Sequence, residues 1–218
     1  DSNGLTILMH AAHGGDTDCL KYALKLPGVD VNQKTSHAID YNYHFYAKGL
    51  SALTIASYWG HIECVKLLFQ VEGIDVNCQN DEGFTPLLCG IQHPEIMKVF
   101  FENPDVDVNI LTTKLLTPIM GVAYMRYEQS VDVFVQNPKV LINYSKHDGM
   151  TVLSVAAKRG MTQMVRALLT RSDLDCTKTS LVGFNALHEA AFEGHSECVA
   201  LLMNAPGIKV NARSEDHM

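Results

Sequence analysis

The 218-residue sequence lacks the long apolar runs that membrane proteins and secreted precursors carry. No uncharged run reaches the roughly 20 residues that a helix needs to cross a membrane. The uncharged stretch from Leu115 to Met125 is shorter than that and contains proline and glycine. The opening residues Asp1-Ser2-Asn3-Gly4 place no basic segment before an apolar core, so they do not resemble a secretory signal. We therefore predict no membrane insertion.

Basic residues are few, and they are scattered along the chain. The sequence has 17 Lys and Arg against 24 Asp and Glu, a formal net charge of −7 with histidine neutral. Nucleic-acid binding depends on clustered Lys and Arg that neutralise phosphates. We therefore expect no nucleic-acid partner.

Motifs of catalysis and of cofactor binding are also missing. The sequence has no glycine-rich phosphate loop and no nucleophile elbow. His188-Glu189 begins like a zinc-protease motif, but the position four residues after His188 is Phe192, so the second metal ligand is absent. We predict a chain that is not an enzyme and holds neither a metal nor another cofactor.

The six cysteines include no Cys-x-x-Cys pair. Cys19, Cys64 and Cys198 stand at the same place in three similar segments, where an apolar side chain would face the core. We interpret these three as buried hydrophobic residues. Cysteines without a disulfide or metal pattern favour a reducing, cytoplasmic location.

What the sequence does have is one unit written six times. Its anchors are Gly4, Gly49, Gly83, Leu115, Gly149 and Gly183. Two residues after each anchor stands a helix N-cap type, namely Thr6, Ser51, Thr85, Thr117, Thr151 or Asn185. A short helix with small residues is expected next, then a turn glycine such as Gly60 or Gly194, and then a second helix such as Ile62 to Leu68.

The cleanest copy runs from Gly183-Phe184-Asn185-Ala186-Leu187-His188 to Val210-Asn211. Its period of about 33 residues and its Ala-Ala, Gly-His and Val-Asn punctuation resemble the ankyrin-repeat family. The resemblance implies an all-α solenoid of stacked helix-turn-helix units with projecting β-hairpin fingers. It also implies a protein or peptide partner, bound by the fingers and by the concave face of the first helices.

We predict a single ankyrin-repeat domain over residues 1–218. The expected repeats are about 1–34, 35–80 with a hairpin insertion at 33–46, 81–112, 113–146, 147–180 and 181–213, and a seventh hairpin starts at 214–218. We expect a monomeric array that is part of a longer protein. Histidines such as His61, His188 and His195 are expected to satisfy turn backbone rather than bind metal.

The third and fourth repeats depart from the pattern, so we expect the middle of the array to be irregular. The third has a shortened turn around His93-Pro94. In the fourth, Leu115 replaces the hairpin glycine and Arg126 replaces the turn glycine. A left-handed conformation kept at either residue would cost about 1 kcal/mol.

The hairpin insertion is aromatic, with Tyr41, Tyr43, His44, Phe45 and Tyr46 close together. Connecting loops are usually short and polar, so these residues form either a contact finger or a flap folded back on the solenoid. The sequence leaves both alternatives open.

The remaining candidates stand at positions that point outward in this architecture. They follow the hairpin glycine or precede the turn glycine, and they are Tyr58, Trp59, Phe84, Leu116, Tyr124, Met125, Lys158, Arg159 and Phe192. An exposed aromatic run is typical of interaction surfaces. For Leu50, Phe84 and Phe184, packing between repeats is the open alternative.

The sequence therefore predicts a non-enzymatic protein-protein interaction module, such as a scaffold or adaptor. The alternative is a regulatory or spacer ankyrin domain attached to a catalytic domain outside this chain.

Overall fold

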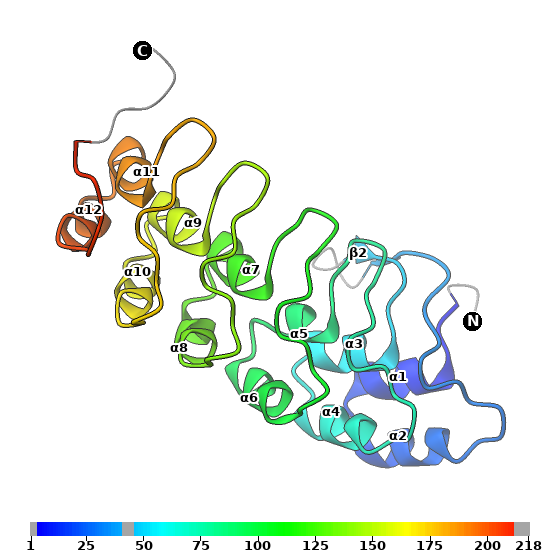
Figure 1. Cartoon of the computed structure of the whole chain (residues 1–218). Helices are drawn as coiled ribbons and strands as arrows, with labels where there is room; N and C mark the ends of the chain where they lie inside the picture. Colours follow the sequence, from blue (N-terminus) through cyan, green and yellow to red (C-terminus); the bar gives the residue numbers. More distant parts are fainter. Residues whose placement is uncertain (1–3, 41–45, 212–218) are drawn as a thin grey trace. The chain divides into compact units, whose positions relative to one another are not determined.

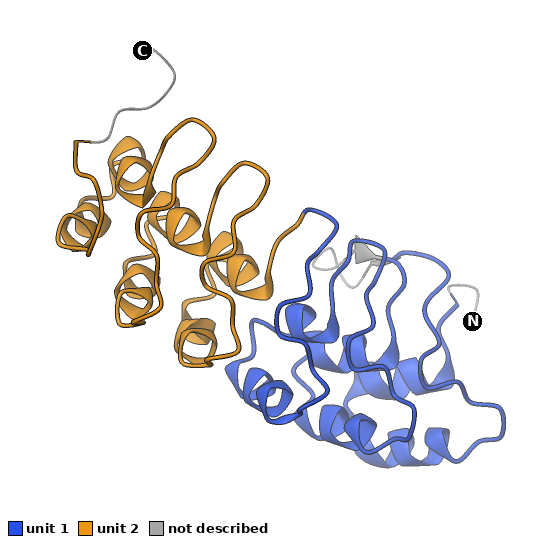
Figure 2. Ribbon diagram, viewed as in Figure 1, with its two compact units in different colours: residues 1–114 blue, residues 115–218 orange. Residues whose placement is uncertain are grey.

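The computed structural model describes residues 4–40 and 46–211. Its helices form two compact units, residues 1–114 and residues 115–218 (Figure 2). Within each unit, first helices pack on first helices and second helices on second helices, which gives two helical layers (Figure 1). The predicted all-α repeat fold is confirmed.

The first unit contains three helix pairs and one short ladder of strands. The pairs are α1 (Ile7–Gly14) with α2 (Thr17–Leu24), α3 (Ala52–Tyr58) with α4 (Ile62–Phe69), and α5 (Pro86–Cys89) with α6 (Pro94–Glu102). Strands β1 (Ile39–Asp40) and β2 (Tyr46–Ala47) pair antiparallel inside the predicted hairpin insertion, with Ile39 opposite Ala47.

The second unit repeats the arrangement with three more pairs. They are α7 (Pro118–Met125) with α8 (Val131–Val135), α9 (Val152–Lys158) with α10 (Thr162–Leu168), and α11 (Ala186–Phe192) with α12 (Ser196–Leu202). A 3-10 turn, η1 (Glu128–Ser130), leads into α8. Every residue of α9 before Lys158 is buried, because α7 and α11 cover it on two sides.

All six predicted N-caps hold their helices as expected. In each, the side-chain oxygen accepts a hydrogen bond from the backbone amide three residues later. Thr85 and Thr117 are followed by a proline at the first helical position, where the missing N–H leaves nothing unsatisfied. The short first helices begin where they do because a cap residue stands there.

A histidine from the next repeat hydrogen-bonds to the turn that follows a first helix. Nε2 of His61 lies 2.9 Å from the carbonyl oxygen of His13, and Nε2 of His195 lies 3.1 Å from that of Lys158. A Cβ on Gly15 or Gly160 would approach the ring within 2.5 Å or 2.6 Å, so the glycine is required by space as well as by its positive φ. The predicted structural role of these histidines is confirmed.

In three repeats, the asparagine that ends the Val-Asn or Ile-Asn pair connects its repeat to the next one. Nδ2 of Asn32 donates to the carbonyl of Gly73 at 2.7 Å, and its Oδ1 accepts from the amide of Asp75 at 2.8 Å. Asn77 and Asn143 make the same pair of bonds one repeat further along. A single side chain thus fixes the spacing of two loops.

The middle of the array is irregular, as predicted. Helix α5 has only 4 residues, and Gly90 at its end has a φ of −89°, so the left-handed turn is lost there. Leu115 and Arg126 keep the left-handed form without being glycine, with φ of 57° and 60°. Met161 stands where His61 and His195 stand in their repeats, so no histidine ring requires a glycine at position 126.

Candidate interaction surfaces

Part of the predicted finger lies outside the described residues. Tyr41, Tyr43, His44 and Phe45 belong to that part, and for Tyr46 only the backbone, in β2, is described. The choice between a contact finger and a folded-back flap therefore stays a prediction.

In the first unit, Trp59 is the centre of a small aromatic cluster. Its ring makes edge contacts with His13 at 5.0 Å and with Tyr58 at 5.4 Å between centroids. Burial lowers the pKa of His13, and the neighbouring His61 and His10 lower it further, which favours the neutral ring. Tyr58 and Trp59 are half-buried, so their side chains are only partly accessible.

None of the residues that follow the hairpin glycine position is as exposed as Met125 or Phe192 at the helix ends. Leu50 is fully buried, which confirms the packing alternative for it. Phe84, Leu116 and Phe184 are half-buried. Their side chains therefore contribute to packing as well as to the surface.

In the second unit, the ring of Tyr124 lies beside two cations. Nζ of Lys146 is 5.8 Å and Cζ of Arg159 is 5.5 Å from its centroid. Lys146 also donates to Oδ2 of Asp148 at 3.0 Å. Burial lowers the pKa of Lys146, but the hydrogen bond to Asp148 and the nearby Tyr124 outweigh burial and raise it. Lys146 is thus a cation beside the Tyr124 ring whose charge is compensated by Asp148.

Lys158 and Arg159 have different roles although they are adjacent. Nζ of Lys158 pairs with Oε2 of Glu189 at 3.2 Å, and the Glu189 side chain is only 7% exposed. This pair joins α9 to α11. No carboxylate of the described residues lies within the 4.0 Å of an ion pair from Arg159, whose guanidinium stays exposed beside Tyr124. The sequence analysis gave both residues the same outward-pointing role and missed Glu189, which the helical spacing places toward the preceding helix.

Met125 and Phe192 are the most exposed apolar residues among the described candidates for partner binding. Met125 is 49% exposed and Phe192 is 76% exposed. The ring of Phe192 lies 6.5 Å from that of Phe184, which stacks on His188 at 5.3 Å. The α7, α9 and α11 ends of this unit thus present apolar, cationic and apolar side chains in succession.

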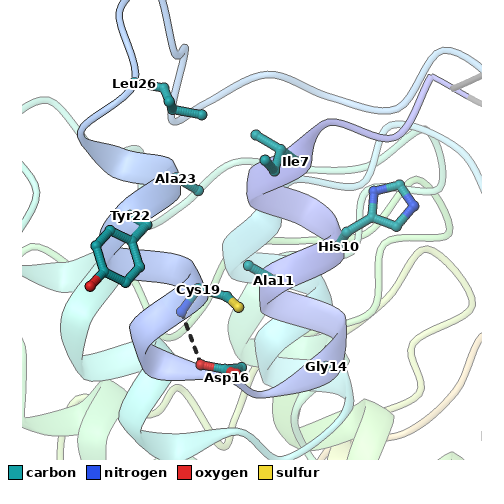
Figure 3. A pocket seen from close by; sticks show the side chains of 9 residues that line it. All are labelled: Ile7, His10, Ala11, Gly14, Asp16, Cys19, Tyr22, Ala23 and Leu26. Carbon is teal, nitrogen blue, oxygen red and sulfur yellow. Dashed lines mark hydrogen bonds between the residues drawn. The ribbon is translucent and has the colours of Figure 1, made fainter.

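A groove that the sequence did not indicate lies along the outer side of α1 and α2 (Figure 3). Its volume is about 510 Å³, and most of its lining is apolar: Ile7, His10, Ala11, Gly14, Asp16, Cys19, Tyr22, Ala23 and Leu26. Ile7 is 58% exposed and Tyr22 is 72% exposed. The sequence could have indicated this groove, since the lining residues keep the apolar helical pattern of later repeats.

The prediction that Cys19 is buried is wrong, because Cys19 is exposed in this groove. Cys64 and Cys198, at the same place in α4 and α12, are fully buried. Sγ of Cys198 lies 3.7 Å from Oγ1 of Thr162, so this helix side faces the preceding helix pair. Among the described residues no helix pair covers that side of α2.

Residues 4–40 and 46–211 contain neither a cluster of metal ligands nor a helix that could span a membrane. No three His, Cys, Asp or Glu side chains in this part of the chain are grouped as metal ligands would be. None of the helices described is both long and apolar enough to cross a membrane.

Comparisons with known proteins agree with the repeat geometry. Among curated proteins, the chain is 22% identical to the human transient receptor potential cation channel subfamily A member 1 over 125 residues, and 38% identical to rabbit (Oryctolagus cuniculus) cortactin-binding protein 2 over 66 residues. These matches cover 57% and 30% of this chain but only 11% and 4% of the relatives.

A solved structure has a similar fold. It is the structure of the Bd0816 predatory endopeptidase from Bdellovibrio bacteriovorus in complex with immunity protein Bd3460. One of its chains superposes with a TM-score of 0.71 at 20% identity, covering 92% of this chain and 98% of that one. The family model for ankyrin repeats in three copies matches residues 8–112 and 119–214. The chain belongs to the ankyrin-repeat family.

Proposed function

We propose that this chain is a non-enzymatic protein-interaction module, a scaffold or adaptor, or the ankyrin part of a longer protein. Ankyrin repeats are generally protein-interaction modules. The partner is a protein or peptide that binds the first-helix faces, α1, α3 and α5 in one unit and α7, α9 and α11 in the other, together with the fingers. The six free thiols support a reducing intracellular location.

One observation carries this proposal: large side chains recur at the carboxyl ends of the first helices. Tyr58, Tyr124, Lys158 and Phe192 stand at the same distance from their N-caps. Ankyrin stacking needs only small or capping residues there, and Phe192 stays 76% exposed. Exposed aromatic and cationic side chains on a rigid layer are the residues that dominate protein interfaces.

Site-specific crosslinking tests the proposal. A photoreactive phenylalanine analogue, p-benzoylphenylalanine, is placed at Met125 or Phe192, and the chain is irradiated in cells. The matched control carries the same analogue at Tyr22, which is exposed at 72% on a second helix. We expect protein adducts from positions 125 and 192 that are absent from position 22. Equal adducts at all three positions, or adducts at position 22 alone, would contradict the proposal.

A further inference from the structure

The charge of the chain is unevenly divided between its two units. Residues 1–114 contain 7 Lys and Arg against 14 Asp and Glu, whereas residues 115–218 contain 10 of each, which together make the 17 and 24 of the whole chain. The whole net charge of −7 therefore belongs to the first unit. An acidic partner segment would be repelled there but not by the second unit, because exposed charges act only over about 8 Å at physiological salt.

Among the first helices and their C-caps, cations stand at Lys158 and Arg159 of α9 and at Arg126, the C-cap of α7, while the C-cap of α11 is Glu193. Helices α1, α3, α5 and α7 contain no Lys, Arg, Asp or Glu, and the only carboxylate within α11 is Glu189, which Lys158 neutralises. Arg159 follows Lys158 at the C-cap of α9. No carboxylate of the described residues forms an ion pair with Arg159, which lies beside Tyr124. Its guanidinium lies beside Tyr124 and is exposed, and a guanidinium can donate two parallel hydrogen bonds to one carboxylate.

Apolar contact sites stand on both sides of this cation. Met125 ends α7, and Phe192 ends α11 on the ring stack of Phe184 and His188. Packed helices lie about 8–10 Å apart, and an extended peptide advances roughly 3.3 Å per residue. Neighbouring helix ends are therefore about three residues of peptide apart.

We propose that the surface of Tyr124, Met125, Arg159 and Phe192 selects an extended acidic peptide segment of a partner protein. This inference rests on the proposed function and names its partner chemistry. The central Asp or Glu of the segment pairs with Arg159. Apolar residues about three positions before and after it contact Met125 and Phe192.

Selection from a random peptide display library on the purified chain tests this. We expect enriched peptides to carry Asp or Glu with an apolar residue about three positions to each side. A synthetic peptide of the enriched sequence, labelled with fluorescein, is then titrated by anisotropy. Replacing its carboxylate by the amide should weaken binding about 10-fold, since a charge-assisted hydrogen-bonded pair is lost.

Variants of the chain locate the interaction. Arg159→Gln should weaken the same peptide about 10-fold and remove most of the salt dependence. Phe192→Ser should weaken it about 5-fold through lost apolar contact. Arg166→Gln is the matched control, because Arg166 is exposed on α10 in the other helical layer of the same unit. It should leave affinity unchanged, and circular dichroism melts show that each variant folds.

The outcomes separate this inference from the proposed function. If enriched peptides lack a carboxylate, or bind Arg159→Gln as well as the wild type, the acidic-segment proposal is wrong while peptide binding stands. The acidic-segment proposal is also wrong if no peptide is enriched. If peptides bind but photoreactive groups at Met125 and Phe192 do not reach them, the first-helix face is not the binding surface and both proposals fail.

Discussion

At the scale of single residues, neighbours decide which side chain a strained backbone position tolerates. Gly160 and Arg126 both have a positive φ after a first helix. A histidine ring packs against Gly160, whereas Met161 stands at the matching place after Arg126. The same backbone conformation therefore requires glycine in one repeat and accepts arginine, at an energetic cost, in another.

Arg126→Gly should stabilise the protein by up to about 1 kcal/mol. The relieved left-handed strain is partly offset by the greater freedom of glycine in the unfolded chain. Arg126→Ala keeps the strain, so we expect no gain from this control. Urea denaturation midpoints measure both variants, and a lower midpoint for Arg126→Gly would contradict the strain argument.

Cys19 should be the thiol that reacts first with Ellman's reagent in the native chain. It is exposed while the other five cysteines are buried. The Asp16 side chain, through its hydrogen bond and its charge, raises the pKa of Cys19 and lowers its thiolate fraction. Asp16→Asn should therefore speed the labelling at pH 7.5 while keeping a helix-capping side chain. Cys19→Ser should abolish the fast phase. A fast phase that survives Cys19→Ser would show that another cysteine is accessible.

At the scale of elements, short helices persist because helices of neighbouring repeats pack against them. Helices of 7 or 8 residues are too short to be stable alone in water, so packing must hold them. Helix α9 is held by an ion pair in addition to packing, because Lys158 pairs with the buried Glu189 of α11. Removing the cation would leave a buried carboxylate without its partner.

Lys158→Met should destabilise the protein by about 1–3 kcal/mol for this reason. Adding Glu189→Gln should recover part of the loss, because the buried group is then uncharged. Lys66→Met is the control, since Lys66 and Glu63 form an exposed pair and its loss should cost less than about 0.5 kcal/mol. Equal losses for Lys158→Met and Lys66→Met in urea melts would show that the buried pair adds nothing.

At the scale of the whole molecule, several carboxylates are tied to local donors that favour their charged form. The pKa is lowered at four of them, Asp16, Asp148, Asp173 and Asp175. For Asp173 the main cause is the hydrogen-bonded Arg171. At Asp148 burial raises the pKa, but the Met150 amide and Lys146 outweigh it.

The stability of the chain should therefore fall on acidification. A carboxylate with a depressed folded pKa stabilises the fold above its unfolded pKa of about 4, and that contribution is lost as pH falls through the folded pKa. We expect the urea midpoint to drop between about pH 5 and pH 3. Asp173→Asn should reduce the drop, whereas the control Glu72→Gln, an exposed loop residue, should not. A midpoint that rises below pH 5 would contradict this expectation.

Much of the fold was predictable because ankyrin repeats are specified by local residues. The caps such as Thr85, the turn glycines and the irregular middle follow from neighbouring residues in the sequence. The surface was less predictable, because exposure depends on which helix pair lies alongside. Cys19 and Cys64 occupy the same place in their repeats, yet Cys19 is exposed and Cys64 is buried.

The sequence by itself determined the repeat, its helix boundaries and the family, since each is encoded within one unit and written six times. Only the tertiary structure decided which of two adjacent cations holds Glu189 and which stays exposed beside Tyr124. It also decided that Trp59 is half-buried and in edge contact with His13, and that α1 and α2 line a groove. The physical reason is that these properties belong to contacts between repeats, which no single unit contains.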